Sequence, residues 1–310
     1  MSTLLKVEPT KRFKDLEIDY LLTFKCNYDC SYCISHDVNH PTLKRNPEEI
    51  IEGVKFLISF YPDKKRKKLV LLGGEPFLYK PIAEVLNELT KLLPVNVLTN
   101  LSVSKNYLNK LDYNNNLTLS SSFHPEFSDP IKFVDKVLYL RREKGQEANC
   151  MVSIHPNEKF LKHSLYVLEK TESEYTSITY LSKMDSNLPD IFGESYAYSS
   201  KIKNAVDKYK KNLGDRDFNY IYEDSTKIIK QSDIVLNNLD NFKGMKCEAG
   251  HQKIHIDEAG HVYPAACFLN TSARLGNIFN KTFKRPSSYV SCPFTSCKCA
   301  TDLLITKFRN

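Results

Sequence analysis

The chain has 310 residues, of which 41% are hydrophobic and 26% charged, and its 44 Lys and Arg against 37 Asp and Glu give a formal net charge of +7. A chain of this length can bury a sizeable core in one or two domains, and its composition excludes a collagen-like or largely disordered protein. The sequence has no visible signal peptide and nowhere the roughly eighteen consecutive apolar residues of a membrane span, so we expect a cytoplasmic protein without a membrane partner.

Strand and helix patterns alternate after residue 17. Short apolar runs predict six strands, at residues 18–24, 68–72, 95–98, 117–121, 148–154 and 177–181. Helical spacing and capping residues predict helices at residues 47–58, 81–93 and 131–140. This order indicates an α/β fold, a partial (β/α)6 TIM-type barrel over residues 17–185, with its chemistry at the carboxyl ends of the strands.

The segments that flank the predicted barrel strands carry less chemical information. We expect residues 1–16 to form an N-terminal extension and residues 186–240 to form a linker or capping segment whose tyrosines pack. The basic run Lys64–Lys68 is interpreted as a solvated loop between a helix and a strand, with a nuclear signal or a nucleic-acid patch as the alternative. No interleaved aromatic residues accompany the run, so a nucleic-acid partner is not expected.

The first of two cysteine groups follows the first predicted strand. Cys26, Cys30 and Cys33 have a C-x3-C-x2-C spacing, which would hold a tetranuclear iron–sulfur cluster through three irons and leave the fourth iron open for chemistry. A structural zinc site needs four closed ligands, and His36 or His40 is near enough in the sequence to keep zinc as an alternative.

A second motif, Gly73-Gly74-Glu75-Pro76, ends the second predicted strand. Glycines let the backbone turn sharply and approach a ligand closely, and a carboxylate there can meet a cationic group. Together the two motifs resemble the radical S-adenosylmethionine superfamily, with Tyr32 in the aromatic position of C-x3-C-x-aromatic-C. The resemblance implies that the three cysteines bind a [4Fe-4S] cluster, that S-adenosylmethionine chelates its open iron, and that the Gly-Gly-Glu-Pro segment engages the methionine amino group.

Polar residues follow the later predicted strands. Asn100 and Ser122 are candidate contacts to the ribose and methionine carboxylate of the cofactor, by resemblance only, and each can equally serve as a loop cap. His124 is a candidate catalytic residue, because a histidine at a strand end can hold substrate or move a proton; the alternative is a histidine bonded into its own loop.

The second cysteine group lies near the end of the sequence. An alternating Ile254–Asp257 run, a turn and Val262-Tyr263 predict a β-hairpin. Its five cysteines are Cys247, Cys267, Cys292, Cys297 and Cys299. Residues 241–310 resemble the twitch and SPASM extensions of the superfamily, which implies an auxiliary [4Fe-4S] cluster; which of the last three cysteines is the spare stays open, and a zinc ribbon is the alternative.

The isolated Cys150, by contrast, lies in a strand-like run and is interpreted as a buried structural thiol.

The function implied by the resemblance is reductive cleavage of S-adenosylmethionine to a 5′-deoxyadenosyl radical that abstracts hydrogen from a substrate. A flavodoxin- or ferredoxin-type donor would supply the electron, and an auxiliary cluster near the substrate would favour a net oxidation or rearrangement. The substrate stays open among small molecules, sugars or nucleotides, and peptides. The alternatives are a viperin-like nucleotide-modifying enzyme and a non-enzymatic iron–sulfur or zinc protein that senses redox state or binds nucleic acid.

Overall fold

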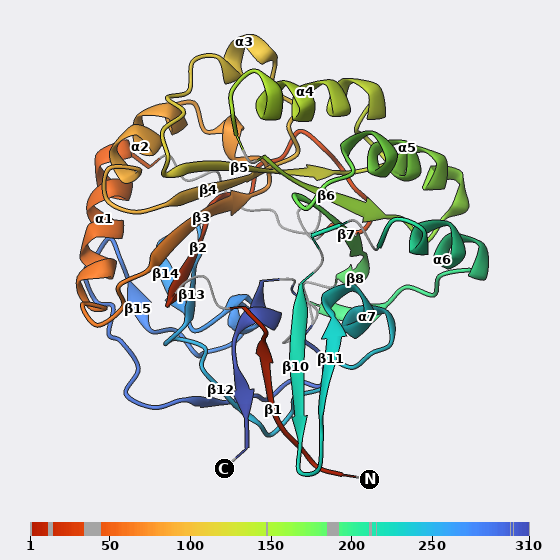
Figure 1. Ribbon diagram of the computed structural model, residues 1–310. Helices are drawn as coiled ribbons and strands as arrows, with labels where there is room; N and C mark the ends of the chain where they lie inside the picture. Colours follow the sequence, from red (N-terminus) through yellow and green to blue (C-terminus); the bar gives the residue numbers. More distant parts are fainter. Residues whose placement is uncertain are drawn as a thin grey trace.

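The largest element of the fold is a nine-stranded sheet in the order β15-β14-β13-β2-β3-β4-β5-β6-β7 (Figure 1). The computed structural model of the protein describes residues 2–11, 15–33, 45–146, 148–184, 192–210, 213–214, 216–297, 299 and 301–309. The barrel strands are β2 (Leu16–Thr23), β3 (Lys67–Gly73), β4 (Val95–Thr99), β5 (Leu117–Phe123), β6 (Asn149–Ile154) and β7 (Thr176–Tyr180). All six are parallel, which confirms the predicted α/β partial barrel. Among the described residues the edge strands β7 and β15 do not pair with each other, so the barrel stays open.

Helices cover the outer face of this sheet (Figure 1). They are α1 (Pro47–Ser59), α2 (Ile82–Leu89), α3 (Lys105–Leu108), α4 (Pro130–Arg142), α5 (Leu161–Thr171) and α6 (Ser200–Asp207). A further helix, α7 (Gln231–Leu236), lies beside β10 and β11 and packs in a second core (Figure 1). The first begins as the sequence predicts, because Asn46 and Glu49 form a reciprocal capping box. The second is shorter than predicted: it ends at Leu89, where the Thr90 hydroxyl donates to the carbonyl of Leu86.

Alternation along each barrel strand separates two faces. Leu69 and Leu71 of β3, for example, are fully buried in the core beneath the helices. Their neighbours Lys68 and Val70 instead line a cavity inside the barrel, together with polar residues of the other strands. The inner face is therefore polar and hollow, which leaves room for a ligand.

A second sheet of six strands, in the order β11-β10-β1-β17-β12-β16, lies across the open side of the barrel (Figure 1). Its strands are β1 (Leu4–Pro9), β10 (Asp217–Tyr222), β11 (Thr226–Lys230), β12 (Lys246–Cys247), β16 (Val290–Ser291) and β17 (Lys307–Phe308). The sequence analysis did not predict β1, which pairs with both β10 and β17. A separate two-stranded sheet is formed by β8 (Ser182–Met184) and β9 (Phe192–Ser195).

The C-terminal hairpin extends the barrel sheet. It consists of β13 (Lys253–Ile256) and β14 (His261–Tyr263), followed by the short β15 (Gly276–Asn277). β13 runs parallel to β2 and pairs with it in register, so the hairpin continues the sheet. In the turn of the hairpin, Glu258 accepts a hydrogen bond from the backbone N–H of Phe24, 3.1 Å away. The hairpin thus contacts the segment that leads into the first cysteine group.

Membrane insertion through a helix has no support in the fold. Across the described ranges, no helix combines the length and the apolarity needed to cross a bilayer.

Candidate functional site

The first cysteine loop is held against the end of β3 by backbone contacts. The N–H of Gly74 donates to the carbonyl of Thr23 at 2.7 Å, and the N–H of Glu75 donates to the carbonyl of Lys25 at 2.8 Å. A Cβ added to Gly73 would lie 2.2 Å from the Thr23 oxygen, and one added to Gly74 would lie 2.3 Å from the Lys25 oxygen. Both glycines are therefore needed for the close approach of the two backbones.

The carboxylate of Glu75 is fully buried at the same strand end. Its Oε1 accepts from the Phe77 N–H and the Thr99 hydroxyl, and its Oε2 accepts from the Asn100 N–H at 2.8 Å. These donors come from the turn after β3 and from the end of β4, so Glu75 joins the two strand ends. The sequence suggested a contact from this carboxylate to a cation; the structure adds an internal role, with Pro76 buried beside it.

Replacing Glu75 by Gln is expected to destabilise this junction. In either orientation the amide nitrogen would face a backbone N–H, that of Asn100 or that of Phe77, which leaves a buried donor unpaired and costs about 1–3 kcal/mol. We expect a lower free energy of unfolding in urea together with weaker binding of S-adenosylmethionine. Glu84→Gln, at an exposed position on α2, removes the same charge and is the control. Equal unfolding free energies for the two variants would contradict this role of Glu75.

The three cysteines of the first group lie in one short loop. Among the described residues, no three His, Cys, Asp or Glu side chains are grouped tightly enough for one metal ion. The cysteines of a tetranuclear cluster each bind a separate iron. Burial raises the pKa of the Cys26 thiol and that of Cys30, the latter to about 12, and the neighbouring Cys33 raises both further. A cationic metal group would remove this mutual repulsion. His36 and His40 lie outside the described residues.

Asn100 ties the end of β4 to the same loop. Its side-chain Nδ2 donates to Asn27 Oδ1 at 3.0 Å and lies 3.8 Å from the sulfur of Cys26. Its Oδ1 accepts from the N–H of Ser102. The amide therefore positions the cysteine loop, which is closer to the loop-cap alternative than to a cofactor contact. Ser122, the next candidate, is half-buried near the end of β5.

Tyr32 and His124 are brought together by the fold. The buried Tyr32 hydroxyl lies 3.0 Å from His124 Nδ1, and the two rings stack. Burial lowers the pKa of His124 to about 4, against a smaller opposing effect of Glu126. The imidazole is therefore neutral at physiological pH and can accept or donate a hydrogen bond without carrying charge.

The low pKa of His124 predicts a pH-dependent stability. Between about pH 6.5 and pH 4 the unfolded histidine binds a proton that the folded one does not, so stability falls as the pH drops through this window. His124→Gln should lose this part of the slope in urea unfolding followed at several pH values. His163→Gln, at an exposed position on α5, is the control. An identical pH slope in wild type and His124→Gln would contradict the burial of a neutral ring.

Two further residues lie beside the cysteine loop, and the sequence analysis did not select them as site residues. Glu126 accepts from both the N–H and the hydroxyl of Ser31, and its Oε1 lies 3.1 Å from His155 Nε2. The pair thus links the loops after β5 and β6 to the cysteine loop. Their positions just after predicted strands were the available signal, because the carboxyl ends of parallel strands meet at one edge.

Four thiols of the second cysteine group influence one another electrostatically. Burial raises the pKa of Cys247 to about 11 and the pKa values of Cys267 and Cys297 well above the usual range, and other thiols of the group, including Cys292, raise each of the three further. Cys247, Cys292 and Cys297 are buried, and Cys267 is half-buried.

Cys299 has different neighbours. Its thiol pKa is raised to about 11 by burial and then by Asp302, while the Lys253 ammonium opposes the rise. Its sulfur lies 3.2 Å from the Thr301 hydroxyl, and Thr301 in turn donates to Asp19 of β2. Cys299 thus faces the ionic group around Lys253 at the barrel wall.

A buried cation accompanies the four thiols. Lys307 is 1% exposed, and its ammonium donates to the carbonyls of Asp302 and Leu303. Burial opposes its charge, yet Cys297 and Cys247 raise its pKa. Backbone positions are also fixed, since Cys267 N–H donates to Asp302 and Cys297 N–H donates to Asp240. Nothing in the sequence pattern marked Lys307.

Comparisons with known proteins point to one family. The model described as "Radical SAM superfamily" matches residues 20–124. The chain is 28% identical over 222 residues to GTP 3′,8-cyclase of Clostridium perfringens, an alignment that covers 64% of this chain and 65% of the cyclase. It is 27% identical over 171 residues to 7-carboxy-7-deazaguanine synthase of Clostridium acetobutylicum, covering 54% of this chain and 70% of the synthase. The chain therefore spans slightly less than two thirds of this cyclase's length.

Solved structures with the same fold include two that bind S-adenosylmethionine. Streptococcus suis SuiB has a TM-score of 0.59 at 16% identity, with 86% of this chain and 63% of SuiB covered. Native anSMEcpe with bound AdoMet has a TM-score of 0.56 at 16% identity, with 87% of this chain and 81% of anSMEcpe covered. At such identities the likeness shows the fold, including the open barrel.

Proposed function

We propose that the protein is an enzyme that reductively cleaves S-adenosylmethionine and abstracts hydrogen from a substrate held inside the barrel. The premise is the match of residues 20–124 to the radical S-adenosylmethionine superfamily. The observation that carries the proposal is the close contact of Gly73 and Gly74 with the backbone of Thr23–Lys25. This contact holds the three-cysteine loop against the end of β3.

In this proposal Cys26, Cys30 and Cys33 hold the [4Fe-4S] cluster. When bound, the cluster and S-adenosylmethionine together supply a one-electron cleavage that produces a hydrogen-abstracting group. The end of β3, from Gly73 to Pro76, binds the methionine end of the cofactor, and the remaining acceptor capacity of Glu75 lies there. The tight packing around Tyr32 excludes water from the reacting centre.

The candidate residues beyond the cysteines take positioning roles. Asn100 fixes the cysteine loop through Asn27, and the neutral His124 holds Tyr32 in place. Ser122 faces the same end of the barrel from β5 and contacts the cofactor or the substrate. His124 becomes a catalytic residue only where the substrate reaches its ring.

We assign the auxiliary [4Fe-4S] cluster to Cys247, Cys267, Cys292 and Cys297, with Cys299 as the spare cysteine. The assignment is supported by the mutual interactions of these four thiols and by the different neighbours of Cys299. The nearby Lys307 stabilises the negative charge of a thiolate-bound cluster. Such a cluster can accept an electron, which gives a net oxidation, or anchor the substrate at an open iron.

Domain limits follow as part of the same proposal: a barrel over residues 17–185, a capping segment over residues 186–240 and a cluster-binding segment over residues 241–310, with residues 1–16 as an extension. A flavodoxin or ferredoxin serves as electron donor. The relatives' names include a nucleotide cyclase and a deazaguanine synthase, which supports a nucleotide or another small molecule as the substrate.

The decisive experiment is anaerobic reconstitution with iron and sulfide, followed by incubation with S-adenosylmethionine and dithionite. Formation of 5′-deoxyadenosine and methionine is the expected result. A reconstituted protein that makes no 5′-deoxyadenosine, or one that purifies anaerobically with stoichiometric zinc, would contradict the proposal and favour the non-enzymatic alternative.

A further inference from the structure

A large cavity lies at the end of the barrel opposite the cysteine loop. Its volume is about 1160 Å³, and Glu17, Lys68 and Asn149 line it from the amino-terminal ends of β2, β3 and β6. Residues from the second sheet and its loops, including Arg216, close the other side. The strands therefore separate this cavity from the proposed cofactor site along the barrel axis.

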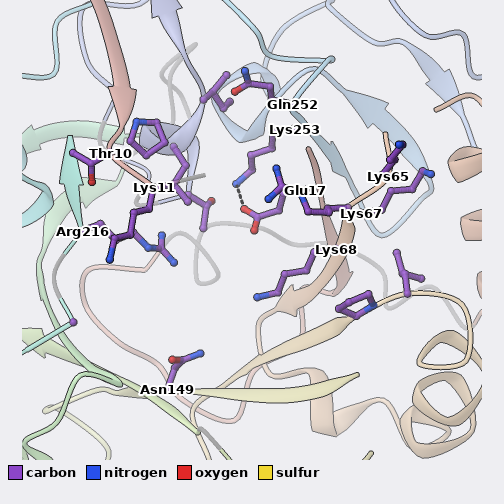
Figure 2. A pocket seen from close by; sticks show the side chains of 18 of the residues that line it. Thr10, Lys11, Glu17, Lys65, Lys67, Lys68, Asn149, Arg216, Gln252 and Lys253 are labelled. Atoms are coloured by element: carbon purple, nitrogen blue, oxygen red, sulfur yellow. Dashed lines mark hydrogen bonds and ion pairs between the residues drawn. The ribbon is translucent and has the colours of Figure 1, made fainter. Parts of the chain in front are cut away.

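The basic run noted in the sequence borders this cavity. Only its first residues lie in a loop; Lys67 and Lys68 begin β3, and all of Lys65–Lys68 line the cavity. Lys11 and Arg216 add positive charge from the opposite wall (Figure 2). The solvated-loop interpretation therefore describes only part of the run.

Two of the three carboxylates that line the cavity are paired with lysines. Glu17 is bonded to the buried Lys253, which also contacts Asp19 and Asp302. Asp217 pairs with Lys230 of the neighbouring strand. Glu174, which is exposed at the rim, is the remaining carboxylate of the lining. The described lining thus carries a clear excess of positive charge.

Lys68 is the residue at the centre of this arrangement. It is half-buried on the inner face of β3 and has no hydrogen bond or ion pair within the described part of the chain. Burial lowers its pKa, and the positive charge of Arg216 lowers it further. Figure 2 shows Lys68, Arg216 and Asn149 pointing toward the same open space from different elements. An anion in that space would lie within reach of both cations.

A smaller cavity continues from this space into the barrel. Val70, Asn96, Ser120 and Met151 line it, all on the inner faces of the barrel strands. Along β3, Lys68 and Gly73 are five residues apart, which corresponds to roughly 16 Å at about 3.3 Å per residue. The smaller cavity has a volume of about 140 Å³ and follows β3 as far as Val70, so a ligand that spans the barrel would have to widen it.

We propose that the cavity around Lys68 and Arg216 binds a phosphate or diphosphate group of the substrate, whose other end extends through the barrel toward the cofactor site. The extension of the substrate toward the cofactor site rests on the proposed function, whereas the anion site does not. Several clustered cations favour a multiply charged anion over a single carboxylate. The cavity therefore defines the substrate as a phosphorylated small molecule.

Calorimetric titration of the full chain with inorganic diphosphate tests the anion site. We expect saturable binding that Lys68→Met and Arg216→Gln each weaken about tenfold or more, the size of one charge-assisted hydrogen bond. Lys91→Met removes an equal charge from an exposed ion pair on the outside of the molecule and should change the affinity less than about twofold. Using two separate variants guards against a folding defect in one of them.

The outcomes separate this inference from the proposed function. Absence of saturable binding, equal losses in Lys68→Met and Lys91→Met, or succinate binding as tightly as diphosphate would overturn the phosphate site. The titration does not depend on cleavage of S-adenosylmethionine. Wild-type protein that binds diphosphate but forms no 5′-deoxyadenosine would therefore contradict the proposed function and leave the anion site standing.

Discussion

Replacing any one of Cys26, Cys30 or Cys33 by alanine is expected to abolish formation of 5′-deoxyadenosine and to lower the iron content by about four atoms per chain. Each cysteine supplies one of only three protein thiolates in this loop, so its loss removes a ligand that the other two cannot replace. Iron analysis and product chromatography after anaerobic reconstitution measure both effects.

The control for this experiment is Cys150→Ala. Cys150 is fully buried on β6 and belongs to the core beneath the helices, away from both cysteine groups. That variant should keep its iron and its cleavage activity, although the lost core volume lowers stability. A protein lacking all three loop cysteines that still forms 5′-deoxyadenosine would disprove the assignment of the first cluster.

The second large effect is expected at the C-terminal cysteines. Wild-type protein should bind about eight irons, and alanine at Cys247, Cys267, Cys292 or Cys297 should leave about four. Because the first cluster is separate, 5′-deoxyadenosine should still form while the substrate is no longer converted to product. Joint loss of both activities would indicate misfolding, which circular dichroism detects.

Cys299→Ala is the matched variant within the same segment. Its sulfur contacts Thr301 and interacts mainly with Asp302, Lys253 and Asp19, so the variant should keep about eight irons. Loss of about four irons in Cys299→Ala, with full iron in Cys297→Ala, would reverse the assignment of the spare cysteine. Alkylation of all five thiols in reconstituted wild type would exclude the auxiliary cluster.

Local pattern was sufficient for the barrel strands and for much of the loop chemistry. The predicted strand at residues 117–121 continues to Phe123, because Ser122 and Phe123 still pair with β6, although three successive serines interrupt the apolar–polar alternation. The two glycines of the Gly73-Gly74 turn indicated a close contact, because their missing side chains leave room for another backbone, which is that of the cysteine loop.

Features that depend on distant partners could not be predicted. β1 is a short strand whose partners, β10 and β17, lie more than 200 residues further along the sequence. The spacing of Cys297 and Cys299 does not distinguish them, whereas in the fold Cys247 and Cys292 raise the pKa of Cys297 and the ammonium of Lys253 opposes the rise in the pKa of Cys299. The same holds for Lys68, whose run of positive charge looks like a surface loop until the cavity beside it is known.

The pairing of β1 with β17 also has a consequence for biosynthesis. These strands are about 300 residues apart, so β17 leaves the ribosome long after the barrel strands have been translated. Closing so long a loop carries an entropic cost and makes this step slow. Because β17 also pairs with β12, which ends at Cys247, this cysteine is not enclosed until the step is complete. Cys247 therefore stays accessible until β17 has been translated and has paired with β12.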